Sequence, residues 1–217
     1  MPDINHLTWD EIGRISDGGD APERLGLGAT KTVSLKDGSV ITLQIIDFNH
    51  DETAAGQLAP VTWETVHVLP KIRPINRNGG NYGGWEQGDV RRWLNRDFSQ
   101  MLPDELRAII KPVVKLTSAG NESSELIRTT DLLWLPSEVE VFGETSYSYP
   151  GEGFQYRFHH DEGQRHCKSW ADATRASWWL RSPIRNGSGY FCGVYAGGSP
   201  SRDYASSSWG LAVALAT

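Results

Sequence analysis

The sequence predicts one α+β domain over residues 1–217, built from short helices, small antiparallel sheets and extensive loops. Three observations lead to this prediction. The 23 glycines and 11 prolines interrupt regular structure along the whole chain. Nine tryptophans supply large aromatic anchors, which suit an irregular core better than a helical bundle. Apolar residues change from helical spacing to strand-like alternation and back, so both element types are expected.

The composition argues against several function classes. The net charge of -6 gives no general attraction to phosphate backbones, so no nucleic acid partner is expected. No apolar run approaches the roughly 20 residues of a membrane helix, so no membrane insertion is expected. Cys167 and Cys192 are too few for a disulfide framework or a four-thiolate zinc site, and no cofactor is predicted. Met1 to Asn5 lacks the pattern of a secretion signal peptide, which predicts a chain made in a reducing cytoplasm.

The first 70 residues predict a helix and a sheet that extend the domain at its N-terminal side. Thr8 and Glu11 form a Thr-x-x-Glu capping box, so a helix starts there and stops at Gly18. Residues 32–46 form a hairpin around an Asp-Gly turn, because this dipeptide accepts the positive φ that tight turns require. Residues 62–69 alternate apolar and polar side chains and continue that sheet.

The middle of the chain predicts a loop followed by two helices. The glycine-rich segment 76–88 cannot pack as a regular element and is expected to be a surface loop. Asp89 is predicted to cap a helix over residues 90–98. A second helix over residues 102–110 begins with a proline and two acids, which the first turn of a helix favours.

Beyond residue 112 the pattern changes to short extended segments. Residues 113–116 and 131–135 are predicted to be strands or buried extended segments. Residues 136–140 begin a turn of helix, and residues 143–164 form a long excursion rich in Gly, Tyr and polar side chains.

The last forty residues predict a small antiparallel sheet that carries two exposed loops. Residues 177–183, 189–196 and 210–216 are the expected strands. The loops between them, residues 184–188 and 197–208, consist mainly of small and polar residues with arginine and tyrosine. Pro183 to Ser208 contains no Lys, Glu, Gln, Met or Trp, a gap that Gly/Ser loops alone would also produce.

At these residues the chain resembles a known family. It is similar to phage- and prophage-encoded proteins with a C-type lectin-like fold of the formylglycine-generating-enzyme type, including the variable proteins of diversity-generating retroelements. The resemblance covers nearly the whole chain, and its most specific part is Trp-Leu-Arg-Ser-Pro followed by Gly-Leu near the C-terminus. The matching segments are residues 7–12, 47–50, 83–86, 90–94, 102–107, 113–115, 178–183, 191–195 and 210–212.

The resemblance implies a display protein that binds a ligand through a variable region at about residues 177–217. The implied partner is a protein or cell-surface receptor, with other phage tail proteins as further partners. The implied location is the phage tail of the virion, or the bacterial cytoplasm before assembly. In diversified members, randomised Asn codons reach a restricted set of residues without Lys, Glu, Gln, Met or Trp. The gap from Pro183 to Ser208 agrees with this mechanism, whereas Trp209 lies outside the reachable set.

The composition of the two loops also suits recognition on physical grounds. Tyrosine gives a large contact area at low entropy cost, while Ser, Gly and Asn adapt their hydrogen bonds. Strand alternation places Tyr190 and Tyr195 on opposite faces unless a bulge intervenes. The candidate ligand-binding residues are Ile184, Arg185, Asn186, Ser188, Tyr190, Tyr195, Ser201, Arg202, Asp203, Tyr204, Ser207 and Trp209.

Two groups of residues have the chemistry to bind a metal. His159, His160, His166, Cys167 and the acids between them match no zinc spacing, and a solvated loop is the preferred interpretation. Asp47, His50, Asp51 and Glu52 offer oxygen ligands for a cation, but a strand end with capping acids is preferred. No metal site is therefore predicted.

No reaction is predicted, although two other function classes stay open. Cys167 and Cys192 raise the alternative of a copper oxidase of the formylglycine-generating type, but they lie outside that enzyme's cysteine pattern. Cys192 is expected to fill space in the core. The second alternative is a structural tail or decoration subunit. Arg181 is expected to hold backbone carbonyls or an acid, and the core or loop-anchoring tryptophans are expected at positions 85, 93, 134, 170, 178 and 179.

Overall fold

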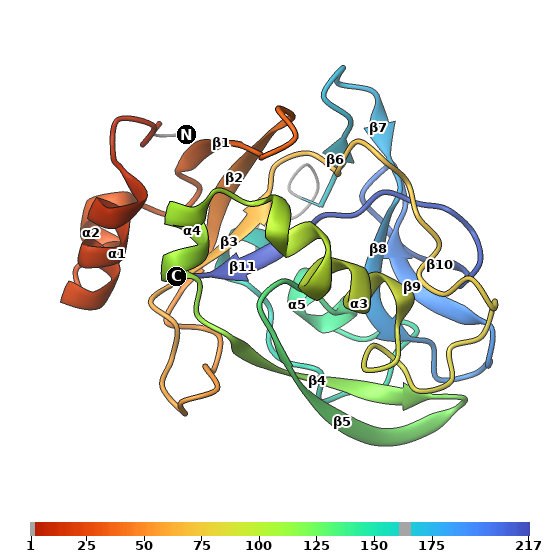
Figure 1. The fold of residues 1–217 in the computed structure, drawn as a ribbon. Coiled ribbons are helices and arrows are strands. Elements are labelled where there is room, and N and C mark those ends of the chain that lie inside the picture. The colour runs from red at the N-terminus through yellow and green to blue at the C-terminus, as the bar shows by residue number, and fades with distance from the viewer. Residues whose placement is uncertain (1–2, 161–165) are drawn as a thin grey trace.

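Two antiparallel sheets organise residues 3–160 and 166–217, which are the residues that the structure describes (Figure 1). In this computed structural model short helices and connecting segments surround the sheets, which confirms the predicted α+β class. The larger sheet has the order β1-β2-β3-β11 and the smaller has the order β10-β9-β8. The strands are β1 (Thr30–Ser34), β2 (Val40–Phe48), β3 (Val61–Thr65) and β11 (Ala214–Ala216) in the first, and β8 (Trp178–Pro183), β9 (Tyr190–Val194) and β10 (Pro200–Tyr204) in the second.

The N-terminal segment forms as predicted. Helix α1 (Trp9–Gly18) has the capping box, in which Thr8 Oγ1 accepts a hydrogen bond from the Glu11 amide at 3.2 Å and Glu11 accepts one from the Thr8 amide at 2.7 Å. The helix ends where Gly19 adopts a φ of 81°. A short helix, α2 (Ala21–Leu25), follows it. The predicted hairpin is β1 with β2, and β3 continues the sheet beside β2.

The C-terminal sheet differs from the prediction in two strands. β11, expected beside β8 and β9, instead pairs with β3, where Leu215 lies opposite Trp63. The third strand of the small sheet is β10, which lies within the predicted loop 197–208. β10 is a polar edge strand held by backbone hydrogen bonds to β9, and it has no apolar alternation by which the sequence could reveal it.

The two middle helices are α3 (Asp89–Arg96) and α4 (Asp104–Ile109), with a 3-10 turn, η1 (Phe98–Met101), between them. Asp89 was predicted to cap α3, and this prediction is wrong because the N-cap position is Gly88. The Asp89 carboxylate accepts a hydrogen bond from the Arg77 amide at 2.9 Å instead.

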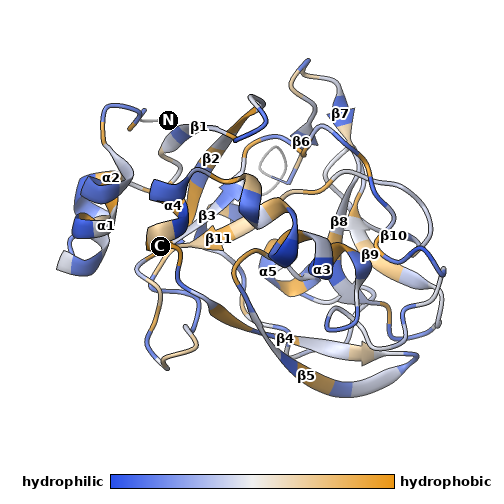
Figure 2. Ribbon diagram, viewed as in Figure 1, coloured by the Kyte–Doolittle hydropathy of each residue, from blue (hydrophilic) through white to orange (hydrophobic). Residues whose placement is uncertain are grey.

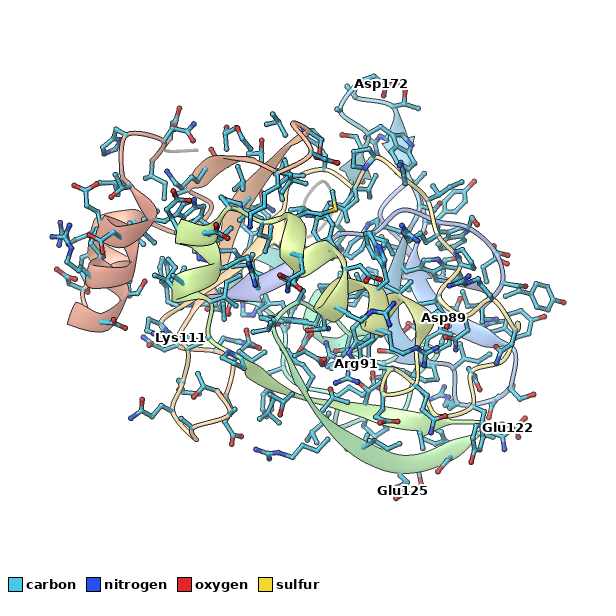
Figure 3. All side chains as sticks on the ribbon, in the orientation of Figure 1. Asp89, Arg91, Lys111, Glu122, Glu125 and Asp172 are labelled. Atoms are coloured by element: carbon cyan, nitrogen blue, oxygen red, sulfur yellow. The ribbon has the colours of Figure 1, made fainter. Side chains whose placement is uncertain are left out.

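The strands β4 (Val113–Gly120) and β5 (Ser123–Asp131) form a long hairpin along one side of the molecule (Figure 1). The sequence analysis did not predict β5, because its only buried residues, Thr129 and Asp131, are polar and few of its side chains are apolar. The predicted strand 131–135 is an extended, mostly buried segment that follows β5 and bridges to β11 through Trp134 and Ala214. Figure 3 shows Glu122 and Glu125 near the tip of the hairpin, with side chains that point outward.

The segment 76–88 is irregular, as predicted, but it is not a simple surface loop. Asn81 and Trp85 are buried in it. Its backbone packs against the β4–β5 hairpin so closely that a Cβ on Gly84 would overlap the Ser118 carbonyl oxygen and one on Gly120 would overlap that of Asn81. The segment is therefore part of the frame.

Residues 136–160 and 166–176 hold short regular elements, among them α5 (Glu138–Phe142) at the predicted position with a Ser137/Glu140 capping box. His159 and His166 are buried, so a solvated loop is the wrong interpretation for these two residues. Residues 161–165, which include Asp161 and Glu162 of the candidate cluster, lie outside the described residues. The other elements are η2 (Arg157–His159), β6 (Lys168–Ser169) and β7 (Arg175–Ala176).

The small sheet packs between two apolar clusters, and Figure 2 shows hydrophobic residues along β9 and β11. Trp179 and Phe191 belong to the larger cluster, and Trp178 and Cys192 belong to the smaller. Four of the six predicted core or anchoring tryptophans are fully buried, at positions 85, 134, 178 and 179, which confirms the prediction for them.

A buried network of charges fixes β8 to the rest of the frame. The Arg181 guanidinium donates to the carbonyl oxygens of Leu135 at 3.1 Å and Glu152 at 2.6 Å, and it forms an ion pair with Glu140. The expectation that Arg181 holds carbonyls and an acid is confirmed. Lys115 forms a further ion pair with Glu140, with 3.0 Å between Nζ and Oε1.

Lys115 also pairs with Asp51 and donates to Tyr156 Oη at 2.9 Å. This partner holds the pKa of Asp51 well below its usual range, against the effect of its burial. Asp47 forms a second ion pair, with Arg157 at 2.5 Å. The region is the end of β2, as expected, and the Asp47 carboxylate accepts hydrogen bonds from the backbone amides of Phe48 at 2.7 Å and Arg157 at 2.9 Å. Both acids are also buried ion-pair partners, which the sequence analysis did not predict.

Glu152 gives the first prediction, a change of stability with pH. Burial raises the pKa of its carboxyl to about 7, although Arg181 and Ser182 favour the charged form. Because the folded state holds this proton more tightly, its stabilising effect is complete below about pH 4.5 and is lost as the pH rises to about 7. The free energy of unfolding, measured relative to Glu152→Gln by urea titration, should fall by about 2 to 3 kcal/mol between pH 4.5 and pH 8.

The matched control for this experiment is Glu125→Gln, an exposed carboxyl on β5. The difference in free energy of unfolding between Glu125→Gln and the wild-type protein should not change between pH 4.5 and pH 8. A flat difference for Glu152→Gln as well would contradict the prediction.

Candidate ligand-binding surface

One face of the small sheet places aromatic and basic side chains in a row beside the buried Cys192. The register is regular between β9 and β10, with Tyr204 opposite Tyr190 and Arg202 opposite Cys192. These four residues therefore share one face, because side chains alternate along a strand. The rings of Tyr190 and Tyr204 lie 4.3 Å apart, and their hydrogen bond raises the pKa of Tyr190.

A pocket of about 530 Å³ opens beside this row. The Arg202 guanidinium lies over the Tyr147 ring, 4.6 Å from its centroid, so Arg202 forms a cation–π contact at the edge of the pocket. Ile184 is only 5% exposed and contributes to the apolar lining. The lining residues are Ser146, Tyr147, Ile184, Arg185, Asn186, Tyr190 and Arg202.

Residues far away in the sequence hold the backbone around the pocket. The Asn81 side chain donates to the carbonyl oxygens of Gly187 at 2.8 Å and Tyr190 at 2.9 Å. The backbone amide of Asn81 donates to the Ser188 carbonyl oxygen at 2.7 Å. On the other side, the Arg185 amide donates to the Tyr147 carbonyl at 2.8 Å. Hydrogen bonds on both sides therefore fix the backbone of the pocket wall.

The Tyr147 segment is held in turn by Glu138. Its carboxylate accepts hydrogen bonds from the amides of Tyr147 and Ser148, at 3.0 Å and 2.7 Å. A buried carboxylate with several such donors orders the loop that presents Tyr147.

The structure brings half of the twelve predicted residues together. Ile184, Arg185, Asn186, Tyr190 and Arg202 line the pocket, and Tyr204 stacks beside Tyr190. The prediction of an exposed loop is wrong for Ile184, since its side chain packs in the smaller apolar cluster.

The other half lies away from the pocket. Ser201 and Asp203 alternate to the opposite face of β10, and Tyr195, 58% exposed, follows the far end of β9. Trp209 stacks on Trp179 with ring centroids 4.8 Å apart, so it is part of the frame. Ser188 and Ser207 lie in the turns that precede β9 and follow β10.

Ser146 and Tyr147 complete the pocket but were not among the predicted site residues. They belong to the excursion 143–164, which has the same Gly/Tyr/Ser composition as the C-terminal loops. This shared composition was the available signal, but the sequence did not indicate that the two segments meet.

Comparison with known proteins gives one match. A family model described as a domain of unknown function (DUF6273) matches residues 47–216. The chain belongs to the DUF6273 family. No curated protein and no solved structure matches the chain.

The DUF6273 segment contains the whole candidate surface. It begins within β2 and ends in β11, so it includes the small sheet, the pocket and the segment 76–88 that supports them. The expected N-terminal extension of about 70 residues overlaps this match from residue 47 onward. The first strand, β1, lies before the match but pairs with β2, which the match includes only in part.

The surface of this DUF6273 domain offers hydrogen-bond donors, aromatic faces and two guanidinium groups. Among the described residues that line the pocket, none is His, Cys, Asp or Glu, the residue types that supply most acids, bases and metal ligands. Within residues 3–160 and 166–217, no three such side chains gather as a metal site.

Two further features of the DUF6273 chain bear on the sequence predictions. Cys192 is fully buried, as expected for a residue that fills space, and burial raises the pKa of its thiol well above the usual range. In the part of the chain that the structure describes, no helix has both the length and the apolar character to cross a membrane.

Proposed function

We propose that this protein binds a protein or cell-surface ligand through the pocket and the tyrosine row on the small sheet, and that it catalyses no reaction. The observation that carries the proposal is the grouping of Tyr190, Tyr204 and Arg202 with Tyr147 around one pocket. Tyrosine and arginine are the residue types that dominate binding energy at interfaces, since each combines a large contact area with hydrogen-bond donors.

The proposal includes a C-type lectin-like fold. Two features support it: the last strand, β11, returns to the N-terminal sheet beside β3, and a second small sheet carries the C-terminal loops. In such a fold a rigid frame tolerates change in the loops, because few of their side chains contribute to the core.

The proposal also includes retroelement diversification and a place on a phage tail. The stretch without Lys, Glu, Gln, Met or Trp, Pro183 to Ser208, spans β9 and β10 and contains all six clustered site residues. Sequencing of the flanking DNA tests this part. A reverse transcriptase gene and a near-copy of the 3′ end that differs at adenines would support diversification, and an isolated gene without either would contradict it.

The oxidase alternative has less support. A copper-binding thiol reacts as the thiolate, whereas the buried Cys192 is held in its neutral form. The double variant Cys167→Ser, Cys192→Ala should therefore leave ligand binding unchanged.

The binding test uses a triple variant that keeps the frame. Arg185→Ser, Arg202→Ser and Tyr204→Ser together change only exposed side chains and leave Ile184 in place. We expect the midpoint of thermal unfolding to stay near that of the wild-type protein, because exposed substitutions usually change stability by about 0.5 kcal/mol or less each. Fluorescently labelled wild-type protein should stain intact cells of at least one species in a bacterial panel, and the triple variant should lower this staining at least tenfold.

The matched control carries Arg14→Ser and Arg24→Ser, two exposed arginines on α1 and α2. It removes the same positive charge far from the surface and should stain cells like the wild-type protein. Unfolding of the triple variant, or equal staining by both variants, would contradict the proposed function.

A further inference from the structure

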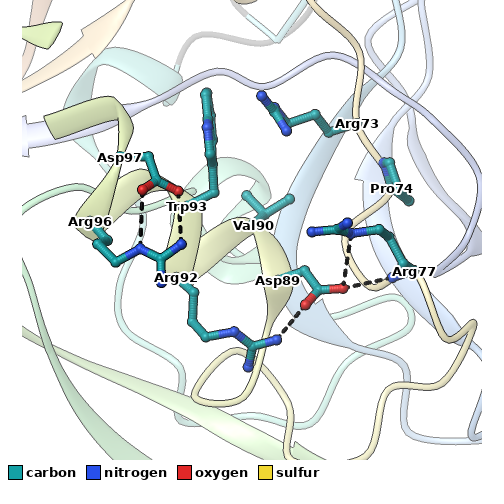
Figure 4. A pocket seen from close by; sticks show the side chains of 9 residues that line it. All are labelled: Arg73, Pro74, Arg77, Asp89, Val90, Arg92, Trp93, Arg96 and Asp97. Atoms are coloured by element: carbon teal, nitrogen blue, oxygen red, sulfur yellow. Dashed lines mark hydrogen bonds and ion pairs between the residues drawn. The ribbon is translucent and has the colours of Figure 1, made fainter. Parts of the chain in front are cut away.

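A second pocket, which shares no lining residue with the candidate ligand-binding surface, is lined by four arginines (Figure 4). It has a volume of about 270 Å³ and lies between residues 73–77 and helix α3. Neither the candidate ligand-binding surface nor the family match explains it. Its lining residues are Arg73, Pro74, Arg77, Asp89, Val90, Arg92, Trp93, Arg96 and Asp97.

The charge of this pocket is opposite to that of the whole protein. Four arginines and two aspartates leave an excess of two positive charges, in a chain whose net charge is -6. Asp89 accepts from Arg92 and from the Arg77 amide, and Asp97 pairs with Arg96 at 3.0 Å. Figure 4 shows these pairs at the sides of the pocket and Arg73 apart from them.

Arg73 has no such partner. Within residues 3–160 and 166–217 no carboxylate lies at ion-pair distance from its guanidinium, and its buried Nε has no hydrogen-bond acceptor. The guanidinium carbon lies 3.8 Å from the centroid of the Trp93 ring. A stacked guanidinium keeps its N–H donors in the plane of the group, where an anion can reach them.

Neighbouring residues hold Arg73 in this position. Its amide donates to the Trp209 carbonyl at 3.0 Å, and its carbonyl accepts from Trp179 Nε1 at 2.9 Å. The Trp93 ring is itself fixed by Phe98, with ring centroids 5.1 Å apart. The donor is therefore preorganised, and a buried donor without an acceptor is costly unless a ligand supplies one.

We propose that this pocket binds the phosphate or sulfate group of a small ligand, with Arg73 as the central donor. The excess of two positive charges matches a dianion, and arginine is the residue type best suited to the planar, multiple hydrogen bonds that such groups accept. The inference rests on residues outside the proposed ligand-binding surface, so either can fail without the other.

The test is a calorimetric titration of the full chain with inorganic phosphate at low ionic strength, where charge pairs are least screened. We expect saturable binding to the wild-type protein and at least tenfold weaker binding to Arg73→Met, which keeps the apolar stem over Trp93. Arg24→Met, an exposed arginine on α2, is the matched charge control and should bind within twofold of the wild-type protein. Absence of saturable binding, or equal affinities for the two variants, would overturn the proposal.

Parallel titrations separate the two sources of the group. Tighter binding of glycerol 3-phosphate than of inorganic phosphate assigns the site to a phosphorylated organic ligand, and the reverse order assigns it to the free ion. Acetate that binds as tightly as phosphate would overturn the preference for a dianion. If Arg73→Met lacks the circular dichroism spectrum of the wild-type protein, the exposed Arg77→Met takes its place, with binding expected to weaken at least threefold.

Discussion

Arg181→Met is expected to lower the free energy of unfolding by about 3 to 5 kcal/mol, the cost of removing one partner from a buried ion pair. The guanidinium is fully buried and holds Glu140 and the carbonyl oxygens of Leu135 and Glu152. Methionine fills a similar volume, so the loss arises from the Glu140 carboxylate and the carbonyls that stay behind without their donor. Urea titration at pH 7 with circular dichroism measures the change.

A second variant separates the lost charge pair from the lost packing. Arg181→Met combined with Glu140→Gln removes both charges, and it should recover a part of the stability that Arg181→Met loses, because no uncompensated charge is left in the core. Arg185→Met, on the exposed side of the loop that follows β8, should change the stability by about 0.5 kcal/mol or less. An Arg181→Met protein as stable as the Arg185→Met protein would show that the buried network does not hold the sheet.

Gly120→Ala is expected to lower the free energy of unfolding by about 2 to 5 kcal/mol, from the sum of a left-handed backbone and an overpacked contact. Gly120 has a φ of 71°, and a Cβ there would overlap the Asn81 carbonyl oxygen. Because Asn81 holds the Gly187 and Tyr190 carbonyls, the substitution should also loosen the candidate ligand-binding surface. Urea titration measures the stability, and hydrogen exchange of the Asn81 amide measures the local effect.

Gly38→Ala is the matched control for this prediction. Gly38 has a φ of 85°, in the turn between β1 and β2, but a Cβ there would meet nothing within 4 Å. Gly38→Ala should lower the free energy of unfolding by about 1 to 2 kcal/mol, because only the left-handed backbone is strained. It should leave the Asn81 backbone amide protected from hydrogen exchange. Equal losses for the two alanine variants would contradict the role given to the contact between Gly120 and Asn81.

The elements that could be predicted are those with a signal inside a few neighbouring residues. The Thr8/Glu11 capping box and the Asp37-Gly38 turn each depend on fewer than ten neighbouring residues, and both form as expected. The strand predicted at residues 62–69 forms as β3, but it ends at Thr65 and is buried on both faces. The strand that contains Arg181 was predicted from a local signal as well. The sequence also predicted that the Arg181 guanidinium binds backbone carbonyls or an acid.

The candidate surface could be predicted only in part. The composition of residues 184–209 indicated recognition, but it did not distinguish Tyr190, which joins the pocket, from Tyr195, which does not. Ser146 and Tyr147 were not predicted, because they lie almost forty positions before Arg185. The sequence alone gave no reason to bring these segments together.

The sequence by itself determined the α+β class, the short helices, most strands and the recognition-like composition of the C-terminal loops, because these follow from local propensity and patterning. Only the tertiary structure decided that β11 joins β3, that β10 pairs with β9, and that Asp51 and Lys115 share a buried ion pair. The physical reason is that sheet partners are joined by backbone groups, which are nearly the same in every residue. The choice among partners therefore depends on how the whole core packs.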